Sequence, residues 1–273
     1  MTSVGTNHYQ IGTSVPGGGA SSGTPIELTG APETWQSGAA AGDVGEYTAT
    51  GAIYLWHATL GRWVRPETFN AGTLASVHEF VGDEDEAAWV SAGYTITKSG
   101  AGAVTTTTIG SLDYTTLDAG TTNSDTCYAV RSGITAGAGR LYQGWAQVIS
   151  ASGSSTQYFA MFPFARNGSR IYWFRGARTA TTADFSLNNG TSVGMADTSA
   201  TDLQAAPVWI EILIEPEPGR AFVWVDHSTS PVASVAGNQC TADTPNDEWF
   251  GDSSTSGKSQ IAFGAGFLVA DIT

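Results

Sequence analysis

The stretch VWIEILIEPEPGRAFVWVDH (Val208–His227) contains two runs of alternating residues, joined by a segment with two prolines and a glycine. Successive side chains of a β-strand point to opposite faces, so the three isoleucines centred on Ile212 share one face of the first run. Glu211 and Glu215 share the other face. The isoleucine face predicts a strand packed on an apolar core, and Gly219 suits the turn into the second run. We therefore expect a β-hairpin whose glutamates face solvent.

The rest of the sequence favours the same kind of structure. The chain has 273 residues, of which 13% are charged and 11% aromatic, and it is rich in glycine. From about residue 83 onward, short runs of β-branched and aromatic residues alternate with Gly, Ser, Thr and Asn turns. This texture is typical of an all-β sandwich of two antiparallel sheets. The segment Thr73–Phe80 differs, because its pattern predicts a helix.

The N-terminal part has a different composition. Residues 1–30 are rich in Gly, Ser, Thr and Pro, which predicts a flexible or extended arm. Residues 31–80 contain a predicted β-hairpin within Ala52–Arg65 that is too small to be stable alone. We expect this small element to dock on the sandwich domain, residues 81–273, or on another subunit.

The charge balance excludes several functions. The net charge of −14 at pH 7 would repel nucleic acids and anionic lipids, so we expect no nucleic-acid partner. No run approaches the roughly 18 apolar residues of a membrane span, so we expect no membrane insertion. The first residues have neither the basic nor the apolar region of a signal peptide, which predicts synthesis in the cytoplasm without secretion.

The order of the strands resembles a known family. WAQVIS, YFAMFPFA, RIYWF, WIEILIEPEPGRAFVWVD and AFGAGFLVADI follow one another as in concanavalin A-like lectin/glucanase jelly rolls, which include laminin G-like domains. The resemblance covers roughly residues 83–273. It implies a two-sheet antiparallel jelly-roll sandwich whose last strand returns beside the first, and a function connected with glycans.

The N-terminal hairpin carries a second resemblance. YLWHATLGRWVRPE (Tyr54–Glu67) looks like short elements near the N-termini of bacteriophage fibre, spike and decoration proteins. With the arm before it, this implies a structural virion protein of a tailed phage, made in the host cytoplasm. Its partners would be other capsid or tail proteins and a host-surface glycan. One alternative is a stand-alone carbohydrate-binding module.

A short motif suggests a second alternative. EILIE (Glu211–Glu215) is one letter away from the EIDIE signature of family 16 glycoside hydrolases, in which the first glutamate is the nucleophile and the last the acid/base. The resemblance implies a glycoside hydrolase that uses Glu211 and Glu215. Leu213 stands in place of the central aspartate, however, and leucine can neither share a proton nor hold a carboxylate. We therefore predict no catalytic residues and no enzyme activity.

Exposed aromatic residues are the candidates for ligand binding. In RIYWFRGAR, alternation places Tyr172 and Phe174 opposite the neighbours that we expect in the core. With Arg175 and Arg178 they form a candidate surface for a sugar ring.

Subunit contacts are predicted in the N-terminal hairpin. Unprotected sheet edges favour a closed homo-oligomer, with a trimer as the preferred form. Tyr54, Trp56 and Trp63 would be the anchors of the interface between subunits.

No cofactor or metal is predicted. The four histidines are far apart in the sequence. The acidic runs Asp83–Glu86 and Asp243–Glu248 lack the spacing of a calcium loop and predict solvated loops. Cys127 and Cys240 fit no metal-binding spacing; they are two buried thiols or, if strands bring them together, a disulfide.

Overall fold

The computed structural model describes residues 24–122, 124–134, 139–152, 157–166, 169–179, 182–188, 206–215, 220–231, 233–236, 246–252 and 258–273. Within residues 150–188, and at some strand ends beside the gaps, the description covers the backbone alone. Most of the predicted arm, residues 1–23, lies outside the described residues.

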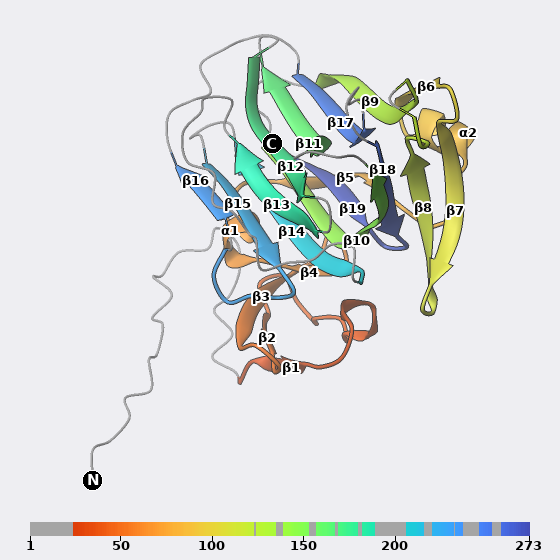
Figure 1. Cartoon of the computed structure of the whole chain (residues 1–273). Helices are drawn as coiled ribbons and strands as arrows, with labels where there is room; N and C mark the ends of the chain where they lie inside the picture. Colours follow the sequence, from red (N-terminus) through yellow and green to blue (C-terminus); the bar gives the residue numbers. More distant parts are fainter. Residues whose placement is uncertain are drawn as a thin grey trace.

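A small sheet opens the described chain and lies below the larger domain in Figure 1. Its order is β1-β2-β3-β4, with β1 parallel to β2 and the other neighbours antiparallel. The elements are β1 (Ile26–Leu28), the 3-10 helix η1 (Pro32–Thr34), β2 (Val44–Tyr47), β3 (Ala52–His57) and β4 (Arg62–Val64). The β-hairpin predicted within residues 52–65 is therefore confirmed as β3 and β4.

Two antiparallel sheets form the larger domain. The nine-stranded sheet has the order β16-β15-β14-β10-β18-β8-β7, and β19 pairs with both β10 and β5. Its strands are β5 (Leu74–Glu79), β7 (Ala103–Ile109), β8 (Leu112–Asp118), β10 (Gly139–Ser152), β14 (Val208–Glu215), β15 (Arg220–Val225), β16 (Ala233–Ala236), β18 (Lys258–Gly264) and β19 (Leu268–Ile272).

The six-stranded sheet faces it, with the order β13-β12-β11-β17-β9-β6. Its strands are β6 (Thr95–Ser99), β9 (Thr126–Ile134), β11 (Gln157–Arg166), β12 (Ser169–Thr179), β13 (Thr182–Asn188) and β17 (Asn246–Asp252). Two short helices, α1 (Pro66–Phe69) and α2 (Glu86–Ser91), lie beside the sheets. The predicted all-β sandwich of two antiparallel sheets is confirmed.

The main core lies between the two large sheets. Ile210, Ile212 and Ile214 of β14 are fully buried in it, together with Phe250 of β17 and Trp89 of α2. The strand β14 pairs with β15 in the register Ile212↔Val223. The hairpin and its apolar face are thus as predicted.

The opposite face of β14 is buried as well. Leu213 of β14 and Trp224 of β15 belong to a second apolar cluster that also contains side chains of β4 and α1. Glu211 is 1% exposed and Glu215 is 5% exposed, so the prediction that they face solvent is wrong. The reason is that the N-terminal residues add a layer over this face, which alternation within one strand cannot reveal.

The boundary between the small element and the sandwich also differs from the prediction. Leu74–Glu79 is a strand, β5, not part of a helix, and it pairs with β19 of the nine-stranded sheet. The pairing Leu74↔Ile272 shows that a long-range contact decides the structure of this segment. The small sheet ends at β4, and the sandwich begins at about residue 74 rather than 81.

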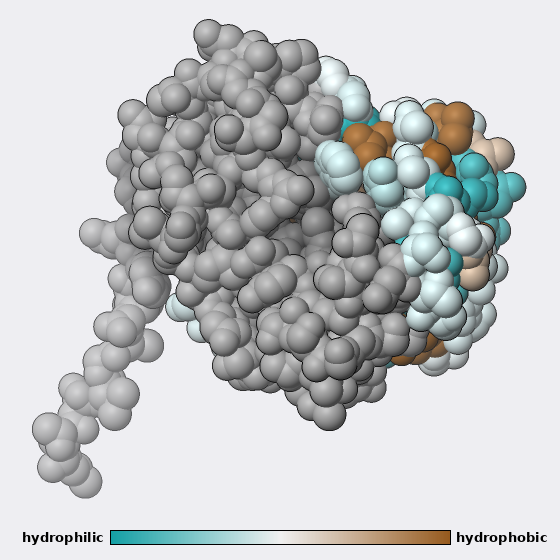
Figure 2. All heavy atoms as spheres, turned by 45° about the horizontal axis from the view of Figure 1, so that its top comes forward, coloured by the Kyte–Doolittle hydropathy of each residue, from teal (hydrophilic) through white to brown (hydrophobic). Residues whose placement is uncertain are grey.

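Part of the described surface is visible in Figure 2. There, teal and pale residues predominate, and brown, apolar residues lie in several separate places. Val81 and Val90 are the large apolar residues most exposed in the described part of the chain. None of the described helices has the length and apolar character needed to cross a membrane.

Candidate functional site

The junction between the small sheet and the nine-stranded sheet is built around Glu211. Arg65, which follows β4, donates from Nε to the two carboxylate oxygens at 3.2 and 3.1 Å, and from a terminal nitrogen to Oε1 at 3.0 Å. Tyr54 of β3 donates its hydroxyl to Oε1 at 2.7 Å. Both partners are buried, since Tyr54 is 0% and Arg65 3% exposed. The Glu211 carboxylate thus accepts hydrogen bonds from two residues of the N-terminal region.

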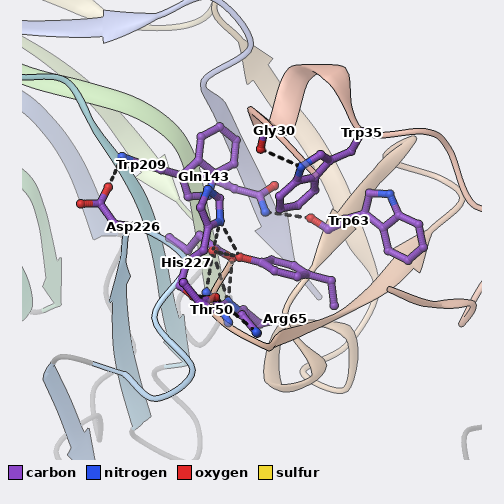
Figure 3. A network of polar contacts seen from close by, with 12 residues as sticks. Gly30, Trp35, Thr50, Trp63, Arg65, Gln143, Trp209, Asp226 and His227 are labelled. Carbon is purple, nitrogen blue, oxygen red and sulfur yellow. Dashed lines mark hydrogen bonds and ion pairs between the residues drawn. The ribbon is translucent and has the colours of Figure 1, made fainter. Parts of the chain in front are cut away.

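His227 completes this network. Its Nδ1 lies 2.8 Å from the Tyr54 hydroxyl and 4.0 Å from Oε1 of Glu211. The hydroxyl has a single hydrogen, so all three groups are satisfied when His227 donates from Nδ1 to Tyr54 and Tyr54 donates to Glu211. The backbone carbonyl of His227 also accepts the hydroxyl of Thr50 at 2.6 Å. Figure 3 shows His227, Thr50 and Arg65 converging on this point.

The backbone at the end of β15 directs His227 toward the junction. Asp226 and His227 have positive φ values of 47° and 57°, a left-handed conformation that Asp and His adopt more readily than most residues. The turn is tied to β14, because the Trp209 amide donates to Asp226 Oδ1 at 3.3 Å. The imidazole lies among the rings of Trp35, Tyr47 and Trp209, with centroids 5.2, 4.6 and 5.4 Å away.

The pKa shifts at the junction follow from burial and from the charge of Glu211. Burial raises the pKa of Tyr54 far above its ordinary value, and the charge of Glu211 adds to this. Burial alone would lower the pKa of Arg65, but the attraction of Glu211 outweighs it and the net shift is upward. Burial lowers the pKa of His227 to about 4, against the opposing attraction of Glu211. At neutral pH the junction therefore contains a cationic arginine beside a neutral tyrosine and a neutral imidazole.

This arrangement links the N-terminal region to the nine-stranded sheet. Retaining glycosidases need two carboxyl groups about 5–5.5 Å apart that both reach the substrate. Here the Glu211 carboxylate accepts hydrogen bonds from Arg65 and Tyr54. Glu215 is buried, and Leu213 packs in the second apolar cluster. Residues of the N-terminal region pack on this face of β14.

A further bond supports the junction beside the Glu211 network. Gln143 of β10, 2% exposed, donates from Nε2 to the backbone carbonyl of Trp63 at 2.8 Å. Trp145 of the same strand donates from Nε1 to Glu33 at 3.1 Å. The contacts between the two sheets therefore extend along β10 as well as β14, as Figure 3 shows for Gln143 and Trp63.

A second buried carboxylate lies inside the sandwich. Glu248 of β17 is 0% exposed and accepts the hydroxyls of Tyr94 and Tyr142 at 2.7 and 2.6 Å. Arg131 of β9 donates from Nε to Glu248 at 3.0 Å and from a terminal nitrogen to Asp271 at 3.2 Å. The network joins both large sheets.

The prediction that Glu248 lies in a solvated acidic run is wrong. The signal that could have found it is alternation in EWF, which puts Glu248 on the same face as the buried Phe250. Of the other members of that run, Asp243 lies outside the described residues and the side chain of Asp247 is not described.

The first acidic run has structural roles. Glu84 is 3% exposed and accepts the backbone amides of Val81 and Gly82, the latter at 3.0 Å. Asp85 caps α2 by accepting the Ala88 amide at 2.9 Å. Among the residues that the structure describes, no group of three or more His, Cys, Asp or Glu is placed to hold a metal ion.

The predicted ligand-binding residues have no described side chains. Tyr172, Phe174, Arg175 and Arg178 lie in β12, of which the backbone alone is described. Their proposed contact with a sugar therefore stays a prediction. Cys127 is buried with a free thiol, and Cys240 lies outside the described residues.

The predicted subunit anchors are buried within the chain. Tyr54, Trp56 and Trp63 are 0%, 8% and 4% exposed and form the core of the small sheet. Trp56 and Trp63 pack edge to face with ring centroids 5.4 Å apart. These three side chains have too little exposed surface to anchor another subunit, because folding of the small sheet already uses them.

Together these features define a β-sandwich protein with an N-terminal sheet fixed to one face of the sandwich. No family model and no curated protein matches the sequence. Solved structures that match include lectin II from Ulex europaeus, at 9% identity over 74% of this chain and 99% of the lectin, with a TM-score of 0.46. An endo-1,3-beta-glucanase from Streptomyces sioyaensis matches at 10% identity over 73% of this chain and 97% of its own, with a TM-score of 0.43.

A third similar structure is the CBM2 module of the evolved Dit of Lactobacillus casei BL23 phage J-1. It matches at 11% identity over 73% of this chain and 96% of the module, with a TM-score of 0.45. The three proteins differ in function, and the likeness lies in the sandwich architecture. It assigns no activity to this chain.

Proposed function

We propose that the protein is a non-catalytic structural protein of a tailed-phage particle: a capsid decoration, spike or short fibre subunit. Its N-terminal segment attaches to other virion proteins, and its sandwich faces the host and contributes to attachment to surface glycans. The observation that carries this proposal is the fixed junction between the small sheet and the sandwich.

A fixed junction suits an anchored subunit. The small sheet is held by the buried Arg65–Glu211 pair, by Tyr54 and by the Thr50 bond to the His227 carbonyl. A partner that binds the segment before β1 would therefore also set the orientation of the sandwich. The resemblance of Tyr54–Glu67 to phage fibre, spike and decoration proteins supports a virion as that partner.

The anchor can be tested without damage to the junction. Deletion of residues 2–23 leaves every described strand in place. We expect this variant to keep the melting temperature of the full chain and to be lost from purified particles, as measured by co-sedimentation. Normal incorporation of the truncated chain would contradict the anchor. Deletion of residues 1–70 is a poor test, because it removes Tyr54 and Arg65, the partners of Glu211, and uncovers the apolar side chains of Leu213 and Trp224.

The alternative of a glycoside hydrolase makes a different prediction. A hydrolase would release reducing sugar from a β-glucan such as laminarin, and Glu215→Gln would abolish this release at an unchanged melting temperature. We expect no release by the wild-type chain, because the Glu211 carboxylate is occupied by Arg65 and Tyr54.

A closed homo-oligomer, with a trimer as the preferred form, is part of the proposal. Since Tyr54, Trp56 and Trp63 are buried within the chain, the contacts between subunits would come from other residues. Light scattering of the full chain tests this, and a monomer at all concentrations would contradict it.

A further inference from the structure

Two aromatic rings lie parallel on the outer face of the six-stranded sheet. The ring centroids of Tyr128 in β9 and Trp249 in β17 are 5.2 Å apart, and the ring planes differ by 7°. Both side chains are partly exposed, whereas their sequence neighbours Cys127, Ala129 and Phe250 are fully buried in the sandwich. Alternation therefore places the pair on the side of the sheet that faces away from the core.

A glycine lies opposite Tyr128 in the neighbouring strand. Gly251 is the cross-strand partner of Tyr128 in the β9–β17 ladder. It has a φ of +90°, and a Cβ atom there would lie 2.6 Å from the carbonyl oxygen of Cys127. Both features require glycine, so β17 places no side chain opposite Tyr128. The ring of Trp249, two residues away, lies beside Tyr128 instead.

The residues on either side of Trp249 hold it in place. Glu248 is bonded to the hydroxyls of Tyr94 and Tyr142 and to Arg131 of the neighbouring strand β9. Phe250 is fully buried among the aromatic rings of the main core. The two strands that carry the rings are thus locked together by a buried ion pair. A surface that is already ordered loses less entropy on binding a ligand.

The surroundings of the pair favour a neutral ligand with hydroxyl groups. Thr97 of β6 is the cross-strand partner of Tyr128, and Thr95 is that of Val130, which in turn pairs with Trp249. Of these neighbours, Thr95 and Thr97 carry hydroxyl groups and Val130 an apolar group, whereas the side chain of Asp247, two residues before Trp249, is not described. A sugar ring combines an apolar C–H face, which packs on aromatic rings, with hydroxyls at its edge that bond to polar side chains.

Nucleic-acid bases also stack on aromatic side chains, but charge argues against them here. Binding of a nucleic-acid backbone depends on lysine and arginine, and this chain has a net charge of −14. We propose that Tyr128 and Trp249 form a binding site for a neutral glycan, with a pyranose ring packed on a ring face that the stacking of the two side chains leaves free and its hydroxyls bonded to Thr95 and Thr97. This site rests on the glycan-attachment part of the proposed function.

The test is titration of the full chain with maltohexaose, cellohexaose, laminarihexaose and chitohexaose, by calorimetry and by tryptophan fluorescence. We expect at least one to bind, and Trp249→Ala to weaken that binding about tenfold or more, the effect of losing one stacking partner. Trp249→Phe keeps a flat ring and should keep most of the affinity. Val130→Ala, which changes a neighbouring outer-face residue without a ring, is the matched control.

Circular dichroism and melting temperature separate a lost site from a lost fold. If none of the four sugars binds the wild-type chain at millimolar concentration, the proposal is wrong. It is also wrong if the folded double variant Tyr128→Ala/Trp249→Ala binds as well as wild type, or if single-stranded DNA binds the pair instead. Incorporation of the double variant into particles is measured separately. The anchor fails if residues 2–23 are dispensable, whatever the outcome for sugars.

Discussion

Glu211 and Glu248 are two buried glutamates with similar partners in different parts of the molecule. Glu211 accepts one tyrosine hydroxyl and Glu248 accepts two, and each pairs with an arginine. The partners of Glu211, Tyr54 and Arg65, come from the N-terminal region, whereas those of Glu248 lie within the sandwich. The same kind of hydrogen-bonded ion pair therefore fixes the small sheet to the sandwich around Glu211 and joins the two large sheets around Glu248.

The different positions of the two networks predict different effects when either glutamate is removed. A buried ion pair is weak evidence of net stability, but removal of one partner leaves an unpaired buried charge. Glu248 joins side chains of both large sheets, so its loss should affect the whole sandwich. Around Glu211 the unpaired charge would lie at the junction, so the small sheet should be affected first.

The largest effect is expected for Glu248→Ala. This change removes the buried acceptor of two tyrosine hydroxyls and of Arg131 Nε, and leaves Arg131 with Asp271 alone as an acidic partner among the described residues. The free energy of unfolding should fall by about 3–5 kcal/mol, as measured by urea denaturation. Glu46→Ala, at an exposed position of β2, is the control. A loss below about 1 kcal/mol for Glu248→Ala would show that the network is not needed.

A smaller effect is expected for Glu211→Gln. Glutamine keeps an oxygen that can accept from Tyr54, but it cannot neutralise Arg65. The expected loss is about 2 kcal/mol, within the range for buried polar groups that lose a partner. Hydrogen exchange should show the loss of protection in β2, β3 and β4 before the six-stranded sheet. Equal loss in both regions would mean that the small sheet is not a separate layer.

The protonation of His227 should make the junction sensitive to acid. Its pKa is about 4 in the folded chain, below the ordinary value, so the unfolded chain binds the proton more tightly between the two values. The contribution of neutral His227 to the free energy of unfolding is therefore complete above about pH 6.5. It is lost as the pH falls, by about 1.4 kcal/mol at pH 5.5. His227→Asn, which tolerates the left-handed backbone, should remove this part of the pH dependence. An unchanged pH profile in that variant would assign the acid sensitivity to other groups.

The smallest effect is expected for an exposed carboxylate. Asp85 caps α2, and Asp85→Ala should cost about 1 kcal/mol in thermal or urea unfolding. Its effect should stay below those of both buried glutamates. A cost equal to that of Glu248→Ala would contradict the distinction between buried and exposed carboxylates.

The sequence was sufficient for the sandwich and for one face of its central hairpin. Alternation of isoleucines placed Ile210, Ile212 and Ile214 in the core. The reason is that a continuous apolar face on a strand fixes which side of the strand is buried. The same rule was wrong for Glu211, since a strand with a layer on each side has no solvent face. The polar identity of Glu211 gave no warning, because its buried partners lie about 150 residues earlier in the chain.

The aromatic residues of the small sheet show the same limit. Tyr54, Trp56 and Trp63 were predicted to be subunit anchors, but their side chains are buried in the core of the small sheet. Whether such side chains pack within their own chain or against another subunit depends on long-range contacts that no local pattern records. Glu248 could have been found, since alternation with Phe250 points it into the core.

The most direct test of the junction is a double-mutant cycle on Arg65→Met and Glu211→Gln, with unfolding free energies measured for the four chains. If the two side chains fix the small sheet to the sandwich as a buried pair, the stability losses of the two single variants should not add. The coupling energy should then be about 1.5 kcal/mol or more. Losses that add to within about 0.5 kcal/mol would contradict this role and would leave Glu211 without a part in fixing the small sheet.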